Sequence, residues 1–119
     1  MSVTRAQVDA ICGSLAGAEL ALPPELLSWK VGGKMFACFG GERDIEGISV
    51  KCADIETAQM VIEAGEAVRA PYFHKSWVRL QFSDADLDDV KIRLLASYEI
   101  VRSSLPKALR DDLSARKEV

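Results

Sequence analysis

The sequence predicts an α+β two-layer sandwich, in which an antiparallel sheet carries the first and last helices on one face. Two observations predict this class: strand-like runs follow one another with short turns between them, and helical patterns lie at both ends of the chain. The 119 residues, 49 % hydrophobic and 28 % charged, fit one ordinary globular domain. We therefore expect a single domain over residues 1–119, with a core from about 4 to 105 and a C-terminal tail over 106–119.

The first expected element is a helix that begins after Thr4. Thr4-Arg5-Ala6-Gln7 matches a capping box, because a hydroxyl at the N-cap and a Gln three residues later can satisfy the free N–H groups. Apolar residues then recur at helical spacing as far as Leu15, and Pro23-Pro24 prevents any continuation.

A β-hairpin is expected next, over 26–31 and 34–39. Gly32-Gly33 separates the two runs, and two glycines suit a type I′ turn, which needs positive φ at both positions. This turn predicts a register in which Val31 faces Lys34, Trp29 faces Phe36 and Leu27 faces Cys38, all on the core face. Ser28, Lys30, Met35 and Ala37 are expected on the other face.

The second half of the chain predicts two strands and two helices. A strand is expected over 45–52, a short helix capped by Asp54 over 54–63, and a strand over 77–82. Pro106 ends the long helix that follows, and 107–119 is expected to be a short, fraying helical tail. The long helix has a core-facing stripe formed by Leu87, Val90, Leu94, Tyr98, Val101 and Leu105.

Composition excludes several classes of protein. No apolar run approaches the roughly 18 residues of a membrane span, and the N-terminus lacks the pattern of a signal peptide. Cys12, Cys38 and Cys52 are odd in number, widely spaced and flanked by apolar residues. This pattern favours buried, reduced thiols in a cytoplasmic protein over a disulfide or a metal site. The net charge of −3 argues against a dedicated high-affinity nucleic-acid binder.

Four segments, taken in order, resemble the MmcQ/YjbR family: 29–37, 49–52, 71–78 and 97–106. The resemblance runs from about Thr4 to Arg110, and it implies a frataxin-like (CyaY-like) α+β fold and DNA binding. Members often have one more residue between the Lys and the Trp than Lys75-Ser76-Trp77 provides, so an exact placement of Lys75 does not carry over from them.

The frataxin-like fold raises the question of iron, which those proteins bind through an acidic ridge on the first helix and adjoining strand. Here that region offers only Asp9 and Glu19, whereas such a cation needs several converging oxygen ligands. The acidic cluster of residues 84–89 lies at the start of the long helix, where carboxylates favour the helix dipole. We therefore expect no metal site and no cofactor.

Catalytic motifs are also missing from the sequence. The chain has one His and lacks a nucleophile elbow, a zinc-protease motif and a phosphate-binding loop. A Cys52–His74 dyad is conceivable, but Cys52 falls on the inward phase of its strand, where a thiol is inert. We therefore expect no enzyme activity and no catalytic residue.

An aromatic and basic segment is the strongest functional signal. No Asp or Glu occurs from Ala67 to Ser83, although the chain has 18 acids against 15 bases. Lys30, Lys51 and Arg79 also fall on the outward phase of their strands. Such a face predicts weak binding of DNA or another nucleic acid without sequence preference. The candidate binding residues are Lys30, Lys34, Lys51, Arg69, Lys75, Trp77 and Arg79.

Two alternatives to nucleic-acid binding stay open at this point. An open sheet face needs polar residues for solubility, and long basic side chains often cover apolar strand surface. An unknown protein partner could instead dock on the aromatic patch of Tyr72, Phe73 and Trp77, which resembles an interface hot spot. No membrane partner is expected.

Overall fold

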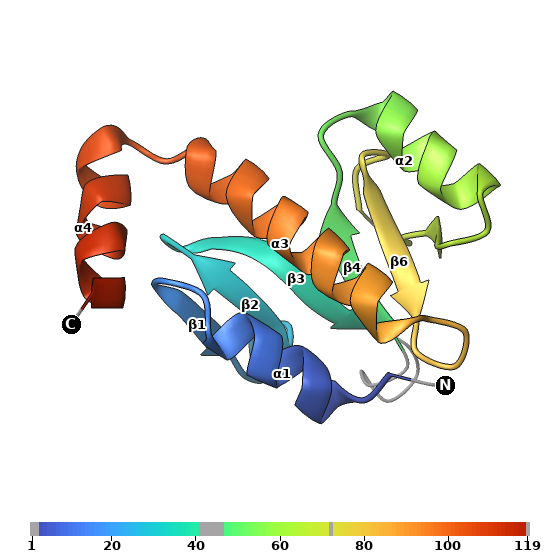
Figure 1. The fold of residues 1–119 in the computed structure, drawn as a ribbon, viewed down its shortest axis with the longest axis horizontal. Helices are drawn as coiled ribbons and strands as arrows, with labels where there is room; N and C mark the ends of the chain where they lie inside the picture. The colour runs from blue at the N-terminus through green and yellow to red at the C-terminus, as the bar shows by residue number, and fades with distance from the viewer. Residues whose placement is uncertain (1–2, 41–46, 72, 119) are drawn as a thin grey trace.

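The computed structural model of the chain confirms the α+β class, and it describes residues 3–40, 47–71 and 73–118, with side chains as far as Leu113 (Figure 1). The sequence also indicates a polar turn over 40–44. Residues 41–44 of this turn and residues 45–46 of the expected strand over 45–52 lie outside the described residues. The elements in chain order are α1 (Arg5–Gly13), β1 (Ala18–Ala21), β2 (Ser28–Val31), β3 (Lys34–Gly40), β4 (Gly47–Lys51), α2 (Ile55–Glu63), β5 (Val68–Arg69), β6 (Trp77–Gln81), α3 (Leu87–Ser103) and α4 (Lys107–Glu118).

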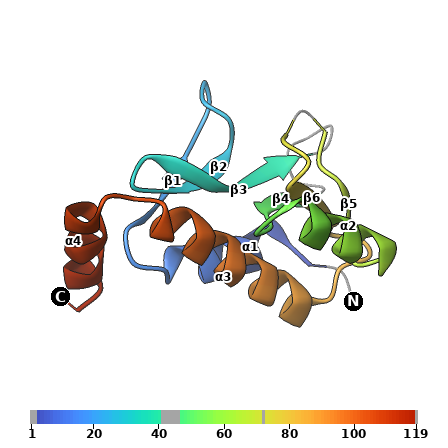
Figure 2. The ribbon, with the colours of Figure 1, turned by 90° about the horizontal axis from the view of Figure 1, so that it is seen from above.

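The six strands form one antiparallel sheet in the order β1-β2-β3-β4-β6-β5. Helix α3 packs across β2, β3 and β4, and α1 packs against α3 and β1. Figure 2 shows that both helices lie on the same side of the sheet. We call the opposite side the open face, because none of the described helices covers it.

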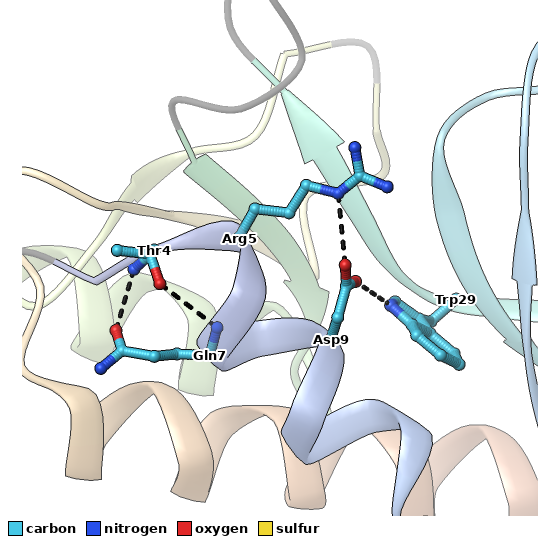
Figure 3. Close-up of polar contacts among 5 residues, drawn as sticks. All are labelled: Thr4, Arg5, Gln7, Asp9 and Trp29. Atoms are coloured by element: carbon cyan, nitrogen blue, oxygen red, sulfur yellow. Dashed lines mark hydrogen bonds and ion pairs between the residues drawn. The ribbon is translucent and has the colours of Figure 1, made fainter.

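Helix α1 is fixed at its N-terminus and on its side. The predicted capping box is present, since Gln7 N–H donates to Thr4 Oγ1 at 3.3 Å and Thr4 N–H donates to Gln7 Oε1 at 2.9 Å (Figure 3). One turn later, Asp9 accepts hydrogen bonds from the Trp29 indole at 2.8 Å and from Arg5 at 3.3 Å. Asp9 thereby ties α1 to β2.

The β2–β3 hairpin contains a β-bulge that the sequence pattern does not predict. Trp29 pairs with Ala37 rather than with Phe36, because the register shifts between Trp29 and Lys30 and leaves Phe36 as an extra residue in β3. Both Phe36 and Ala37 are fully buried in the core beneath the helices. The expectation that Ala37 lies on the open face is therefore wrong.

The same bulge moves Cys38 to the open face. Cys38 pairs with Ser28 on β2 and with Ser49 on β4, so the expected pair of Cys38 with Leu27 is wrong. The turn itself is as predicted: Val31 pairs with Lys34, and Gly32 and Gly33 both have positive φ.

Ser97 of α3 bridges the two strands at the bulge. Its hydroxyl donates to the Phe36 carbonyl at 2.6 Å and accepts from the Lys51 N–H at 2.9 Å. Because Ser97 is fully buried, these two backbone groups have no access to water as an alternative partner.

The predicted stripe of α3 is confirmed except at its first residue. Val90, Leu94, Tyr98 and Val101 are buried, whereas Leu87 is 39 % exposed. Leu87 is the first residue of the helix, directly after the N-cap Asp86. The acidic residues around it act as expected, because Asp86 accepts from the N–H groups of the first turn.

Two short edge strands and a docked C-terminal helix complete the fold. Strands β1 and β5 are absent from the sequence prediction. The predicted helical tail exists as α4, but its Leu113 is only 1 % exposed and contacts Gly17. An added Cβ at Gly17, which has positive φ, would collide with this leucine, so the tail is anchored at that point rather than frayed.

Candidate nucleic-acid interface

The register of β4 and β6 brings three predicted site residues together on the open face. Lys51 pairs with Trp77, and Ser49 pairs with Arg79, so Lys51, Trp77 and Arg79 share one side of the sheet. Val50 and Val78, which alternate with them, are fully buried on the helix side. The outward phase expected from the sequence is therefore confirmed. We call Lys51, Phe73, Trp77 and Arg79 the Trp77 patch.

The loop before β6 braces Trp77. The rings of Phe73 and Trp77 stack with centroids 4.8 Å apart at 26°, which leaves Trp77 only partly exposed. Trp77 N–H also donates to the His74 carbonyl at 2.9 Å. Tyr72, the third aromatic residue of the expected patch, lies outside the described residues. In the described part of the loop, Trp77 thus has one ring face covered by Phe73.

His74 is held by the same loop. Ser76 N–H donates to His74 Nδ1 at 3.1 Å, and the Ser76 hydroxyl lies 2.9 Å from the same nitrogen. An Nδ1 that accepts a backbone N–H carries no proton, so the neutral imidazole holds its proton on Nε2. The conceivable nucleophile Cys52 is buried, and that burial raises the pKa of its thiol, which disfavours the reactive thiolate.

Arg79 does not extend from the sheet but lies along it. Its Cγ and Cδ pass over Gly47, 3.1 Å and 3.2 Å from where a Cβ would stand, and a Cβ at Gly40 would collide with Nη2. Two glycines, paired across β3 and β4, therefore make room for a flat guanidinium. Sequence reasoning assigned 40–41 to a turn and did not connect Gly47 with Arg79. The available signal was a glycine inside a strand pattern, which marks a close approach to the backbone.

Two polar atoms beneath the patch lack partners in the described part of the chain. Ser49 Oγ and Arg79 Nε are both buried and without a hydrogen bond. Burying part of a guanidinium is unfavourable unless an anion or hydrogen-bond acceptor contacts it, and the described residues supply no such partner to Arg79 Nε.

Charge pairing divides the seven candidate residues. Lys30 lies on the open face, but its ammonium is 2.8 Å from Glu25, which neutralises it. Lys51, Lys75 and Arg79 have no ion pair among the residues that the structure describes.

Two further candidates lie outside the patch. Lys34 pairs with Val31, and Arg69 pairs with Val78, so by register both fall on the helix side of the sheet. Lys75 is exposed in the loop, two residues before Trp77. The structure therefore brings Lys51, Trp77 and Arg79 together, with Lys75 in the adjoining loop, and separates Lys30, Lys34 and Arg69 from them.

An open hollow of about 690 Å³ borders the patch at the start of α2. Lys51, His74 and Ser76 line one part of it, and Asp54 and Glu56 line another. Asp54 caps α2 through Thr57 N–H at 2.7 Å, and this hydrogen bond lowers the pKa of the carboxyl group. These two acids, which sequence reasoning did not connect with the patch, limit how far an anion can extend beyond Lys51.

Three other observations bear on the expected functional classes. Cys12, Cys38 and Cys52 are buried and form no disulfide, as predicted. Over residues 3–40, 47–71 and 73–118, no three His, Cys, Asp or Glu residues come together as a metal site. The same residues include no helix that is both long and apolar enough to cross a membrane.

The fold and the patch together define a small α+β protein with one helix-free, locally basic sheet face. The YjbR family model matches residues 13–100, and the chain therefore belongs to the YjbR family, as its sequence motifs predicted. The Deinococcus radiodurans protein DR2400, whose crystal structure is described under the domain name DUF419, has a similar fold with a TM-score of 0.76 and 22 % sequence identity. The similarity covers 90 % of this chain and 85 % of DR2400. No curated protein matches the chain significantly.

Proposed function

We propose that this protein binds nucleic acid weakly, without sequence preference, through the Trp77 patch and the neighbouring Lys75. The observation that carries the proposal is the juxtaposition of Lys51 and Arg79, which have no ion pair in the described structure, with a braced indole on the open face. Cations of this kind contact phosphates, and an indole stacks on a base. The patch offers few groups that could read base edges, so sequence preference should be small.

The cations of the patch, together with the neighbouring Lys75, determine the expected affinity. Three cations, Lys51, Lys75 and Arg79, correspond to about three phosphate contacts, so raising salt from about 50 to about 200 mM should weaken binding roughly 20- to 40-fold. The net charge of −3 opposes long-range approach. We therefore expect a dissociation constant in the micromolar range or weaker, as in other non-specific complexes.

The test is a fluorescence-anisotropy titration of labelled single- and double-stranded DNA at these two salt concentrations. Lys51→Glu and Arg79→Glu, alone and combined, should abolish most of the binding. The matched control is Lys91→Glu, a charge reversal at an exposed residue of α3, which should bind like the wild type. Absence of binding to either DNA at low salt would overturn the proposal, and full binding by the double variant would overturn the assigned face.

A protein partner on the aromatic patch is the competing function. It predicts association that survives moderate salt and is lost in Trp77→Ala. The stack of Phe73 on Trp77 favours the nucleic-acid proposal, because it reduces the apolar area that a protein partner could bury.

We place the activity outside catalysis and without a cofactor, in a reducing compartment such as the cytoplasm. The buried thiols support the compartment, because free cysteines are typical of reduced surroundings. The engaged Nδ1 of His74 and the raised pKa of Cys52 support the absence of an activated nucleophile. An unusually reactive Cys52 in thiol labelling of the folded protein would contradict this placement.

A further inference from the structure

The floor of the open face beside the patch consists of small residues. Ser28, Cys38, Ser49 and Arg79 form one registered row across β2, β3, β4 and β6. The first three side chains of this row are short and buried, although no described helix covers them. Figure 2 shows that the chain between β1 and β2 rises from the sheet on this side. Because these three side chains are buried, a ligand on this face contacts the partly exposed Arg79 at the end of the row rather than the serines and the cysteine.

The orientation of the Arg79 side chain determines how close to the sheet a ligand must come. Its aliphatic stem lies over Gly47 and its guanidinium lies over Gly40, so a phosphate contacts the guanidinium only close to the sheet surface. A flexible single strand can follow that surface. Duplex DNA is stiff over about 150 base pairs and presents its phosphates on the outside of a rod, so few of them can reach a recessed cation at once.

Trp77 provides the second contact at a suitable spacing. It lies two residues before Arg79 on the same face of β6, which corresponds to about 7 Å along a strand. One ring face is covered by Phe73, and a nucleic-acid base can stack on the indole only if it is not already paired and stacked inside a duplex.

From these features we infer that the ligand class is single-stranded nucleic acid, with a base stacked on Trp77 and an adjacent phosphate at the Arg79 guanidinium. This inference rests on the proposed function and narrows its ligand. Lys51, which pairs with Trp77 on the neighbouring strand, is placed to contact a second phosphate beside the stacked base. The ligand then supplies an anion to Arg79, which has no ion pair among the described residues.

The test compares a labelled thymidine oligonucleotide with a hairpin duplex of the same length at low salt. The wild type should bind the single strand at least about 5-fold more tightly. Trp77→Ala should weaken single-strand binding by about 5- to 150-fold, the equivalent of losing one stacked base, and should change duplex binding less than about 2-fold. Trp77→Phe, the conservative variant, should recover part of the loss. Thermal unfolding of each variant establishes that it is folded.

Indole fluorescence gives a readout that is independent of affinity. The single strand should quench the wild-type signal and leave Trp77→Phe unquenched, because the remaining Trp29 is buried under α1. Equal or tighter duplex binding that is insensitive to Trp77→Ala would overturn the inference and leave the proposed function intact. Equal loss of both ligands in Trp77→Ala would also overturn it, since Trp77 would then support the patch rather than stack on a base. Absence of binding to either ligand overturns both proposals.

Discussion

Replacement of Ser97 by alanine tests the connection between α3 and the two strands that carry the bulge and Lys51. The hydroxyl of Ser97 makes two hydrogen bonds, to the Phe36 carbonyl at 2.6 Å and from the Lys51 N–H at 2.9 Å, in a fully buried place. Each buried backbone group left without a partner costs about 1–3 kcal/mol. Partial closure of β3 onto β4 would recover some of this loss, so we expect Ser97→Ala to lower the free energy of unfolding by about 2–4 kcal/mol.

The assays are urea unfolding and thermal unfolding, both followed by circular dichroism, with amide exchange of Lys51 as a local readout. At roughly 4 °C per kcal/mol for a domain of this size, the melting temperature should fall by about 8–16 °C. Ser103→Ala, at an exposed position of the same helix, is the matched control and should stay within about 0.5 kcal/mol. A loss below about 0.5 kcal/mol in Ser97→Ala, with Lys51 still protected from exchange, would refute the reasoning, because the strands would then pair without the hydroxyl.

Four further predictions concern the core, the last helix, the thiols and metals. Leu94→Ala should cost about 2–5 kcal/mol in urea unfolding because it opens a cavity in the core; a near-neutral result would contradict its burial. Leu113→Ala should lower the free energy of unfolding by a comparable amount, and Gly17→Ala should also destabilise the protein. Wild-type stability in both variants would contradict the docking of α4. Burial raises the pKa of Cys12 from 9.0 to about 12, so between these pH values the unfolded chain binds fewer protons than the native protein. The free energy of unfolding should therefore fall as the pH rises from 9 to 12. Cys12→Ala should show a smaller fall. Elemental analysis should find no stoichiometric iron or zinc, and a tightly bound metal would contradict the expectation from the sequence.

The fold could be predicted from the sequence where a local pattern decides the structure. The Thr4 capping box, the Gly32-Gly33 turn and the apolar stripe of α3 are each determined by residues within a few positions of one another. The two edge strands could not be predicted in this way, because β1 has four residues and β5 has two, and each exists only through pairing with a neighbour. At the bulge, the Phe36 carbonyl accepts a hydrogen bond from Ser97, which lies far away in the sequence, so no local pattern could predict this contact.

The candidate site could be predicted as far as strand alternation determines it. Alternation correctly assigned Lys51, Trp77 and Arg79 to one face, because successive side chains in a strand point to opposite sides. It could not predict that Lys30 is paired with Glu25, since the two meet through the geometry of a loop. It also could not predict that the Arg79 side chain lies flat on the sheet, because the space for it is left by Gly40 on β3 and Gly47 on β4.

The pairing of Lys30 explains why the patch is small on a face that carries more basic residues. Lys30 on β2 and Lys51 on β4 are two strands apart, about 10 Å across the sheet, which is close to the Debye length at physiological salt. An unpaired Lys30 would still add to the attraction of a polyanion there, but Glu25 cancels most of its field. On the α2 side, Asp54 and Glu56 oppose an anion in the same way. The attraction is therefore confined to the part of the open face between these acids, where Lys51, Trp77 and Arg79 lie, and an extended ligand can use only a short stretch of its backbone.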